Sequence, residues 1–182
     1  MIQPVVEGEG EEEAVPVLLR RLLSELGVYD VAVGRPIVKD RTLLVREANF
    51  KATMEIATLV PGVRAILVLF DSDDDCARNL LPSMTRWANE VTYLPCAIVL
   101  ARREYEAWFL AAIESLRGAR GIRDNAAYPQ DPEAKRNAKQ ALRRFMPRNV
   151  SYSPRLDQPA LSARFDSVSG YEPVVPTEWT RD

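Results

Sequence analysis

The fold is decided by the stretch Val63-Arg64-Ala65-Ile66-Leu67-Val68-Leu69-Phe70-Asp71-Ser72-Asp73. A short, continuous apolar run of this kind is typical of a strand that is buried on both faces of a parallel sheet. Residues 2–6 form a second apolar strand, which leads directly into Glu7. Because ligands of parallel sheets gather beyond the carboxyl ends of the strands, we expect Glu7, Asp71 and Asp73 to lie at one edge.

The rest of the chain alternates strand and helix patterns. Further strands are predicted within residues 30–38 and over 93–101, and residues 9–13 are predicted to form a polar loop. Helices are predicted from about 15 to 26 and over 47–59, 74–89, 104–116, 133–145 and 159–165. This alternation favours an α/β fold, a three-layer domain with a mostly parallel central sheet flanked by helices. The length of 182 residues predicts a single domain over 1–166, with a basic helical segment at about 117–155 and an irregular tail over 167–182.

Composition excludes several kinds of chemistry. The chain has no histidine, so Ser-His-Asp and Cys-His catalysis are excluded, and its two cysteines, Cys76 and Cys96, form no disulfide framework. No apolar run approaches the roughly 20 residues that span a bilayer, and the chain begins with a strand pattern rather than a signal peptide. We therefore expect a cytoplasmic protein in which carboxylates, lysine, tyrosine or metal-bound water move protons.

Glu7, Asp71 and Asp73 would repel one another at the sheet edge unless a positive charge lies near them. Three acidic groups placed together raise one another's pKa, and a hard divalent cation such as Mg²⁺ relieves that repulsion. Glu106 is a further candidate ligand, since it borders the apolar stripe of the helix predicted over 104–116, and its alternative is a salt bridge to a neighbouring arginine. Asp74 and Asp75 are better explained as caps of a helix start. Phosphate chemistry is the leading hypothesis.

A basic stretch follows the acidic half of the chain. Between Arg117 and Arg155 there are ten basic and three acidic residues, although the net charge of the whole chain is −2. Arginines beside a metal-type cluster suit a protein that holds a nucleic acid through its phosphates. The alternative is an ordinary solvated helix face. The candidate nucleic-acid-binding residues are Arg117, Arg120, Lys139, Arg143, Arg144 and Arg148.

Glu7-Gly8 at the end of the first strand and Asp71-x-Asp73 at the end of a later one look like a Toprim domain, the metal-binding fold of topoisomerases, primases and OLD-type nucleases. The chain resembles an uncharacterised bacterial Toprim-like family of the DUF4276 type. The resemblance rests on four strings, at residues 6–11, 69–76, 103–110 and 152–161. The resemblance implies metal ligation by Glu7, Asp71 and Asp73, with Glu11 at the second acidic position of the first motif. It also implies a late lysine that stabilises the scissile phosphate. This chain has Pro154 there, and the adjacent Arg155 can supply the charge but not a proton.

These observations predict a nuclease or phosphotransfer enzyme that acts on nucleic acid with Mg²⁺ or Mn²⁺. The predicted catalytic residues are Glu7, Asp71, Asp73 and Arg155, and the predicted metal ligands are Glu7, Glu11, Asp71, Asp73 and Glu106. One alternative is a non-catalytic metal- and nucleic-acid-binding component of a larger complex, in which a protein partner supplies the chemistry. Another is a degenerate, purely structural member of the family.

Overall fold

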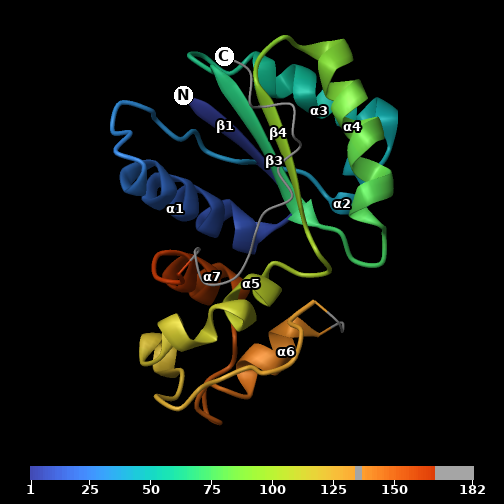
Figure 1. Ribbon diagram of the computed structural model, residues 1–182. Helices are drawn as coiled ribbons and strands as arrows, with labels where there is room; N and C mark the ends of the chain where they lie inside the picture. The colour runs from blue at the N-terminus through green and yellow to red at the C-terminus, as the bar shows by residue number, and fades with distance from the viewer. Residues whose placement is uncertain (134–136, 167–182) are drawn as a thin grey trace.

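A computed structural model describes residues 1–133 and 137–166. Its sheet has four parallel strands in the order β2-β1-β3-β4 (Figure 1). The strands are β1 Ile2–Val6, β2 Ile37–Val38, β3 Ala65–Asp71 and β4 Cys96–Ala101. Val6 of β1 is in register with Leu69 of β3, so the two strands end at the same edge of the sheet. The predicted α/β fold with a parallel, helix-flanked sheet is confirmed.

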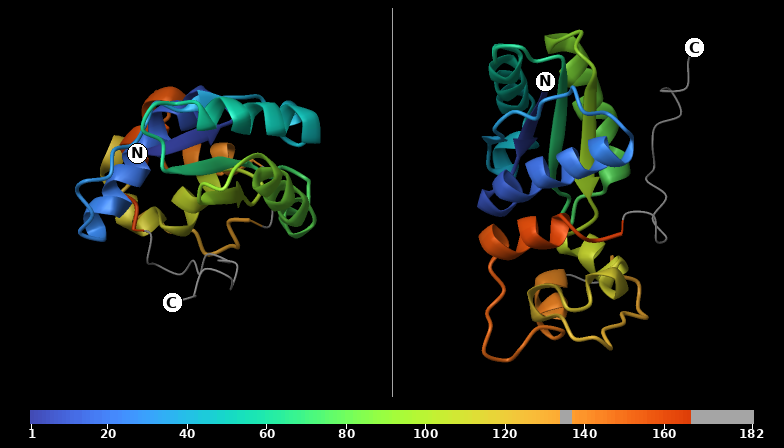
Figure 2. Two further views of the ribbon diagram at one scale, coloured as in Figure 1. Left: turned by 90° about the horizontal axis from the view of Figure 1, so that it is seen from above. Right: turned by 90° about the vertical axis from the view of Figure 1, so that its left-hand side faces the viewer.

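Helices cover both faces of the sheet and its carboxyl edge. The α-helices are α1 Glu9–Glu25, α2 Arg41–Leu44, α3 Glu47–Thr58, α4 Ala77–Val91, α5 Glu106–Ala111, α6 Ala138–Arg143 and α7 Pro154–Ser162, and two 3₁₀ turns are η1 Ile113–Leu116 and η2 Ala119–Gly121. Helices α3 and α4 pack on one face, and α1 covers the other with α7 beside it (Figure 2). Helices α5 and α6 lie beyond the ends of the strands (Figure 1).

Two apolar clusters explain why β3 is hydrophobic throughout. Val68 and Phe70 point to one face, where they pack in a cluster with Phe50 of α3 and Trp87 of α4. Leu69 points to the other face and belongs to a cluster that extends from α1 through α5 to α6 and α7. Since the segments beyond the strands share this second cluster with the sheet, packing fixes their position relative to the carboxyl edge.

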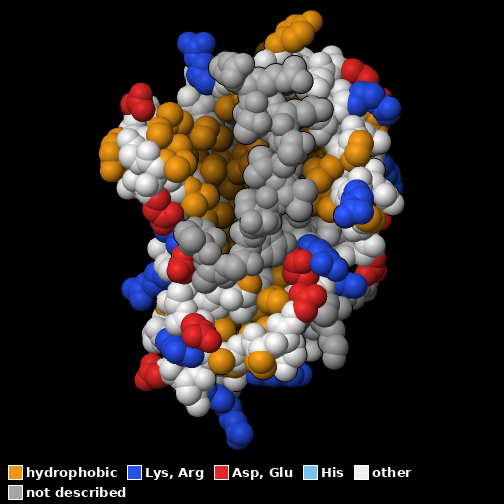
Figure 3. All heavy atoms as spheres, viewed as in Figure 1, with side chains coloured by type: hydrophobic (Ala, Val, Ile, Leu, Met, Phe, Trp, Pro, Cys, Tyr) orange, Lys and Arg blue, Asp and Glu red, His pale blue; other side chains and the backbone are white. Residues whose placement is uncertain are grey.

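The surface carries no unusual segregation of charge in the view of Figure 3. Hydrophobic side chains gather over α1 and the sheet, and charged side chains of both signs lie around them (Figure 3). Among the described residues, no helix has the length and apolar character needed to cross a membrane.

The first helix begins earlier than predicted. Residues 9–13 are helical rather than a polar loop, because α1 starts at Glu9. Glu9, Glu11 and Glu12 lie in its first turn, where negative side chains interact favourably with the positive end of the helix dipole. This early start is important for the site, because it turns Glu11 back toward the sheet edge.

The second half of the chain is less helical than predicted. The helix expected over 104–116 is divided at Ala112 into α5 and η1. Within residues 117–155, α6 and the single turn η2 are the main helical elements described, and α6 is shorter than the predicted 133–145. Helix α7 begins at Pro154, earlier than predicted, because proline suits a first helical turn. The tail over 167–182 lies outside the described residues.

Candidate functional site

Glu7 and Asp71 meet at the carboxyl edge of the sheet. Asp71 is the last residue of β3, and its backbone N–H donates to Oε2 of Glu7 over 3.4 Å. Its own Oδ1 accepts a 2.8 Å hydrogen bond from the backbone N–H of Tyr105. Asp71 is 9% exposed, so its carboxyl group is held in one orientation away from bulk water.

Gln158 of α7 joins two further carboxylates, and the negative charges of both act on Asp71. Its Nε2 donates to Glu11 Oε1 over 3.2 Å and to Glu106 Oε1 over 2.9 Å. The Tyr152 hydroxyl donates a second hydrogen bond to Glu106 Oε1, over 2.8 Å. Helices α1 and α5 thus add Glu11 and Glu106 to the pair at the sheet edge. We call these four buried or half-buried side chains the acidic cluster: Glu7, Glu11, Asp71 and Glu106.

The position of Gln158 depends on a glycine in α1. A Cβ atom on Gly10 would lie 2.0 Å from Gln158 Oε1 and 2.9 Å from Pro154 Cβ, so α7 packs on α1 where a side chain is absent. Gly10 therefore allows the amide of Gln158 to reach the acidic cluster.

Burial, joined by repulsion at Asp71 and Glu7, raises the pKa of three carboxyl groups of the site, those of Asp71, Glu7 and Glu106. Burial, followed by the charges of Glu106, Glu11 and Glu7, raises the pKa of Asp71 to about 8. Burial is also the main cause that raises the pKa of Glu7 and that of Glu106. Asp71 therefore resists ionisation near neutral pH, as expected where negative charge exceeds the nearby positive charge.

Lys139 provides positive charge beside the acidic cluster. Its Nζ lies 3.9 Å from Glu106 Oε2. Burial favours a lower pKa for Lys139, but the charges of Glu106, Asp71, Glu11 and Glu104 outweigh burial and raise it. The backbone N–H of Lys139 also donates to Glu104 Oε2 over 3.1 Å, which fixes the start of α6. Sequence reasoning assigned Lys139 to a nucleic-acid surface, whereas its ammonium group faces the carboxylates.

Asp73 lies outside the acidic cluster, in the loop after β3. Its side chain is 54% exposed, its φ is 50°, and its Oδ2 forms an ion pair with Arg41 Nε over 3.4 Å. Arg41 also donates to the carbonyl oxygens of Asp71 and Ser72, over 3.0 and 2.9 Å, and pairs with Asp75. Arg41 therefore holds the loop between β3 and α4 against the end of β2.

The oxygen atoms of the site suit a hard cation. Among the described side chains, Glu106 Oε2 and Gln158 Oε1 are buried oxygens with no hydrogen-bond donor. Carboxylate and amide oxygens are the ligands that Mg²⁺ and Mn²⁺ prefer. Within residues 1–133 and 137–166, however, no group of three or more histidine, cysteine, aspartate or glutamate side chains is arranged so that it could hold an ion. The carboxylates would have to turn toward a common point to bind one.

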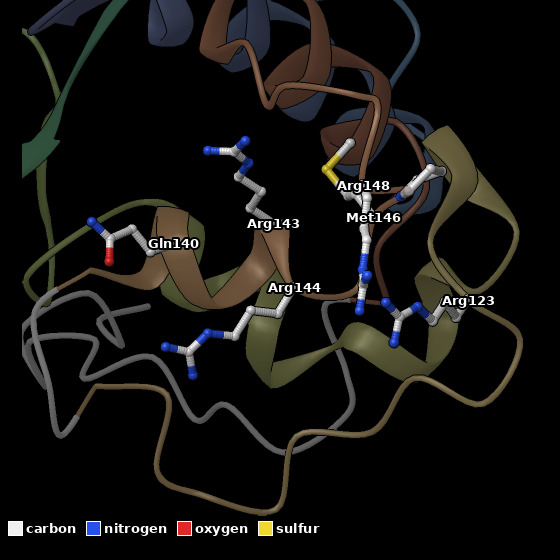
Figure 4. A pocket seen from close by; sticks show the side chains of 7 residues that line it. Arg123, Gln140, Arg143, Arg144, Met146 and Arg148 are labelled. Atoms are coloured by element: carbon white, nitrogen blue, oxygen red, sulfur yellow. The ribbon is translucent and has the colours of Figure 1, made fainter.

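The predicted basic residues divide into three groups. Arg117 donates to the carbonyl oxygen of Ala126 over 2.9 Å, and Arg120 forms a 2.5 Å ion pair with the buried Asp157, so both stabilise local structure. Arg155 is exposed and forms no ion pair with a described residue of the acidic cluster. Arg143, Arg144 and Arg148 line a cavity of about 480 Å³ together with Arg123 and Gln140 (Figure 4).

Sequence reasoning missed Arg41, Gln158 and Tyr152. Arg41 follows β2, and the rule that places Glu7 and Asp71 at the carboxyl edge applies equally to residues after that strand. Gln158 and Tyr152 lie in the 152–161 string, but neither residue type carries a distinctive metal or catalytic spacing. Only the packing of α7 on α1 brings them to the carboxylates.

Comparison with known proteins gives one finding. A family model described as "Domain of unknown function (DUF4276)" matches residues 6–167, a range that includes the acidic cluster, Asp73 and Lys139. Neither the curated proteins nor the solved structures contain a match to the chain.

Proposed function

We propose that this chain, which belongs to the DUF4276 family, is a Mg²⁺- or Mn²⁺-dependent nuclease or related phosphotransfer enzyme that acts on nucleic acid. We further propose that its sheet is related to the Toprim domains that its sequence resembles. One observation carries the proposal: four buried or half-buried carboxylates meet at the carboxyl edge, and Lys139 is the one described residue that forms an ion pair with them.

The ligands we propose are Glu7, Glu11, Asp71 and Glu106, with Asp73 at the rim of the site. The chemistry that a bound divalent ion supplies is activation of water and neutralisation of charge on the reacting phosphate. An ion would also offset the repulsion that, together with burial as the larger cause, raises the pKa of Asp71 to about 8.

The remaining groups position these carboxylates and supply charge. The Tyr105 N–H orients Asp71, and Gln158 and Tyr152 orient Glu106 through the hydrogen bonds described above. Lys139 supplies a positive charge close to the carboxylates, where it favours a phosphate oxygen. Arg155 remains the sequence-based candidate for a second positive charge on the phosphate.

A non-catalytic metal- and nucleic-acid-binding component is the second candidate function. The observation in its favour is that Pro154 occupies the position where the resemblance implies a lysine, and that the adjacent Arg155 forms no ion pair with a described residue of the acidic cluster. A protein partner would then supply the chemistry.

Cleavage assays separate the two functions. Purified protein with Mn²⁺ should nick supercoiled plasmid or degrade single strands, and Asp71→Asn should abolish the activity while leaving the domain folded. Asp30→Asn makes the same change in an exposed loop before β2 and should retain activity. Cleavage by Asp71→Asn at the wild-type rate would contradict the enzyme proposal. Binding of metal and nucleic acid without cleavage would favour the second function.

A further inference from the structure

Four arginines line an open cavity to which no residue of the acidic cluster contributes. Arg143 and Arg144 come from the end of α6, Arg123 from the loop after η2, and Arg148 from the segment after α6 (Figure 4). The cavity has a volume of about 480 Å³, and Gln140 adds a neutral polar side chain to its wall. We call this cavity the arginine pocket.

The positive charges of the arginine pocket are not neutralised by described residues. No acidic side chain lines the pocket, and none of its four arginine side chains forms an ion pair or hydrogen bond within residues 1–133 and 137–166. Arg117 and Arg120, in contrast, are engaged by a backbone carbonyl and by Asp157. Like charges around one cavity repel one another, so an anion that enters it is favoured.

The number and type of charges indicate phosphate rather than a single carboxylate. The guanidinium group is a planar fork that forms two parallel hydrogen bonds with phosphate oxygens. Four such groups exceed what one singly charged carboxylate balances. They suit several consecutive phosphodiesters, which carry one negative charge each. A cavity of about 480 Å³ is also larger than one phosphate group requires.

Helix α6 connects the arginine pocket to the acidic cluster. Lys139 and Arg143 are four residues apart and therefore lie on the same side of the helix. At 1.5 Å per residue, their backbones are separated by about 6 Å along the helix axis. One end of this row faces Glu106, and the other end lines the arginine pocket. A chain of phosphates could therefore contact both.

We propose that the arginine pocket holds the phosphates of a nucleic-acid strand that neighbour the phosphate at the acidic cluster. This inference rests on the proposed function, and it assigns the substrate-holding role to Arg123, Arg143, Arg144 and Arg148. Arg117 and Arg120 are excluded from that role because they stabilise the loops around η2.

The test compares two double variants that each lose two positive charges. Arg143→Ala with Arg144→Ala alters the pocket, and Arg20→Ala with Arg64→Ala alters two exposed arginines that form no described ion pair. Binding of a fluorescent single-stranded oligonucleotide is measured by anisotropy in EDTA, so that metal and cleavage play no part. The pocket variant should bind about tenfold more weakly, and its plot of log K against log salt should flatten by about 1.4. The control should bind almost as the wild type does.

Two further arms identify the source of the phosphate. The first compares a 5′-phosphorylated oligonucleotide with its 5′-hydroxyl counterpart. If the phosphorylated one binds more tightly to the wild type but not to the pocket variant, the pocket holds a strand end. Equal binding of the two would assign it to internal phosphates. The second measures binding of pyrophosphate. If pyrophosphate binds to the pocket but the two double variants bind the oligonucleotide equally well, the pocket is a small-anion site and the proposal is overturned.

Failure of this inference differs from failure of the nuclease proposal. Weakened binding by the pocket variant in a protein that cuts nothing would support the pocket and contradict the enzyme. Cleavage that depends on Asp71, with equal oligonucleotide binding by wild type and pocket variant, would support the enzyme and overturn the pocket. Thermal melts of both double variants confirm that each remains folded.

Discussion

Asp71→Asn should stabilise the metal-free protein at alkaline pH. The folded-state pKa of Asp71 is raised from 3.8 to about 8, first by burial and then by repulsion from Glu106, Glu11 and Glu7. Between these pH values the folded protein retains a proton that the unfolded chain has released. The stability provided by that proton is complete below about pH 4 and is lost as the pH rises through about 8.

The size of the effect follows from the shift. A difference of about four pKa units corresponds to a ceiling of about 5 to 6 kcal/mol, at about 1.4 kcal/mol per unit. Water entry and movement of Glu7 reduce this ceiling, since buried sites respond with an effective dielectric constant of about 20. We therefore expect a gain of about 2 to 4 kcal/mol for Asp71→Asn at about pH 9. Asparagine retains the Oδ1 that accepts the Tyr105 N–H, so the variant removes the charge without removing that hydrogen bond.

Urea unfolding in EDTA, followed by circular dichroism between about pH 5 and pH 9, measures this effect. The wild type should lose stability as the pH rises, and Asp71→Asn should lose less. Asp30→Asn, an exposed aspartate, controls for removal of one negative charge and should change stability by no more than about 0.5 kcal/mol. Equal loss of stability by wild type and Asp71→Asn over the whole range would refute the assigned burial and repulsion.

Two further substitutions test how the site is held. Gly10→Ala should lower the free energy of unfolding in urea by about 1 to 3 kcal/mol, because the new Cβ would clash with Gln158. This loss should occur although alanine is the better helix former. A gain in stability would show that α7 can move away from α1 freely. Arg41→Ala should lower the free energy of unfolding by about 1 to 3 kcal/mol, because it removes the hydrogen bonds to the loop after β3. Arg41→Lys should restore little of this stability, because lysine lacks the planar fork. Full rescue by lysine would show that Arg41 acts only through its charge near Asp73.

The sequence was sufficient to predict the sheet and the edge where acids meet. Strands β1 and β3 are largely buried and mostly apolar, and residues at the end of each parallel strand must lie at the carboxyl edge. The residue pattern alone predicts a loop over residues 9–13, so only the resemblance indicates that Glu11 belongs to the site. Helical geometry at the start of α1, not a loop, is what directs Glu11 toward Asp71.

The parts of the site that could not be predicted depend on contacts between distant segments. Lys139 has the same sequence character as Arg143, one turn away in a basic stretch, yet it faces Glu106 while Arg143 lines the arginine pocket. Gln158 reaches Glu106 because α7 packs on α1 at Gly10. No local periodicity distinguishes these residues, since each orientation is set by a partner far away in the chain.

Anomalous diffraction from crystals soaked in Mn²⁺ tests the proposed metal site most directly. The proposal predicts an anomalous peak with oxygen ligands at about 2.0 to 2.6 Å from Asp71 and at least two of Glu7, Glu11 and Glu106. It also predicts that Lys139 moves away from Glu106, and that crystals of Asp71→Asn lack the peak. An acidic cluster without a peak at saturating Mn²⁺, with Lys139 still 3.9 Å from Glu106, would contradict the account.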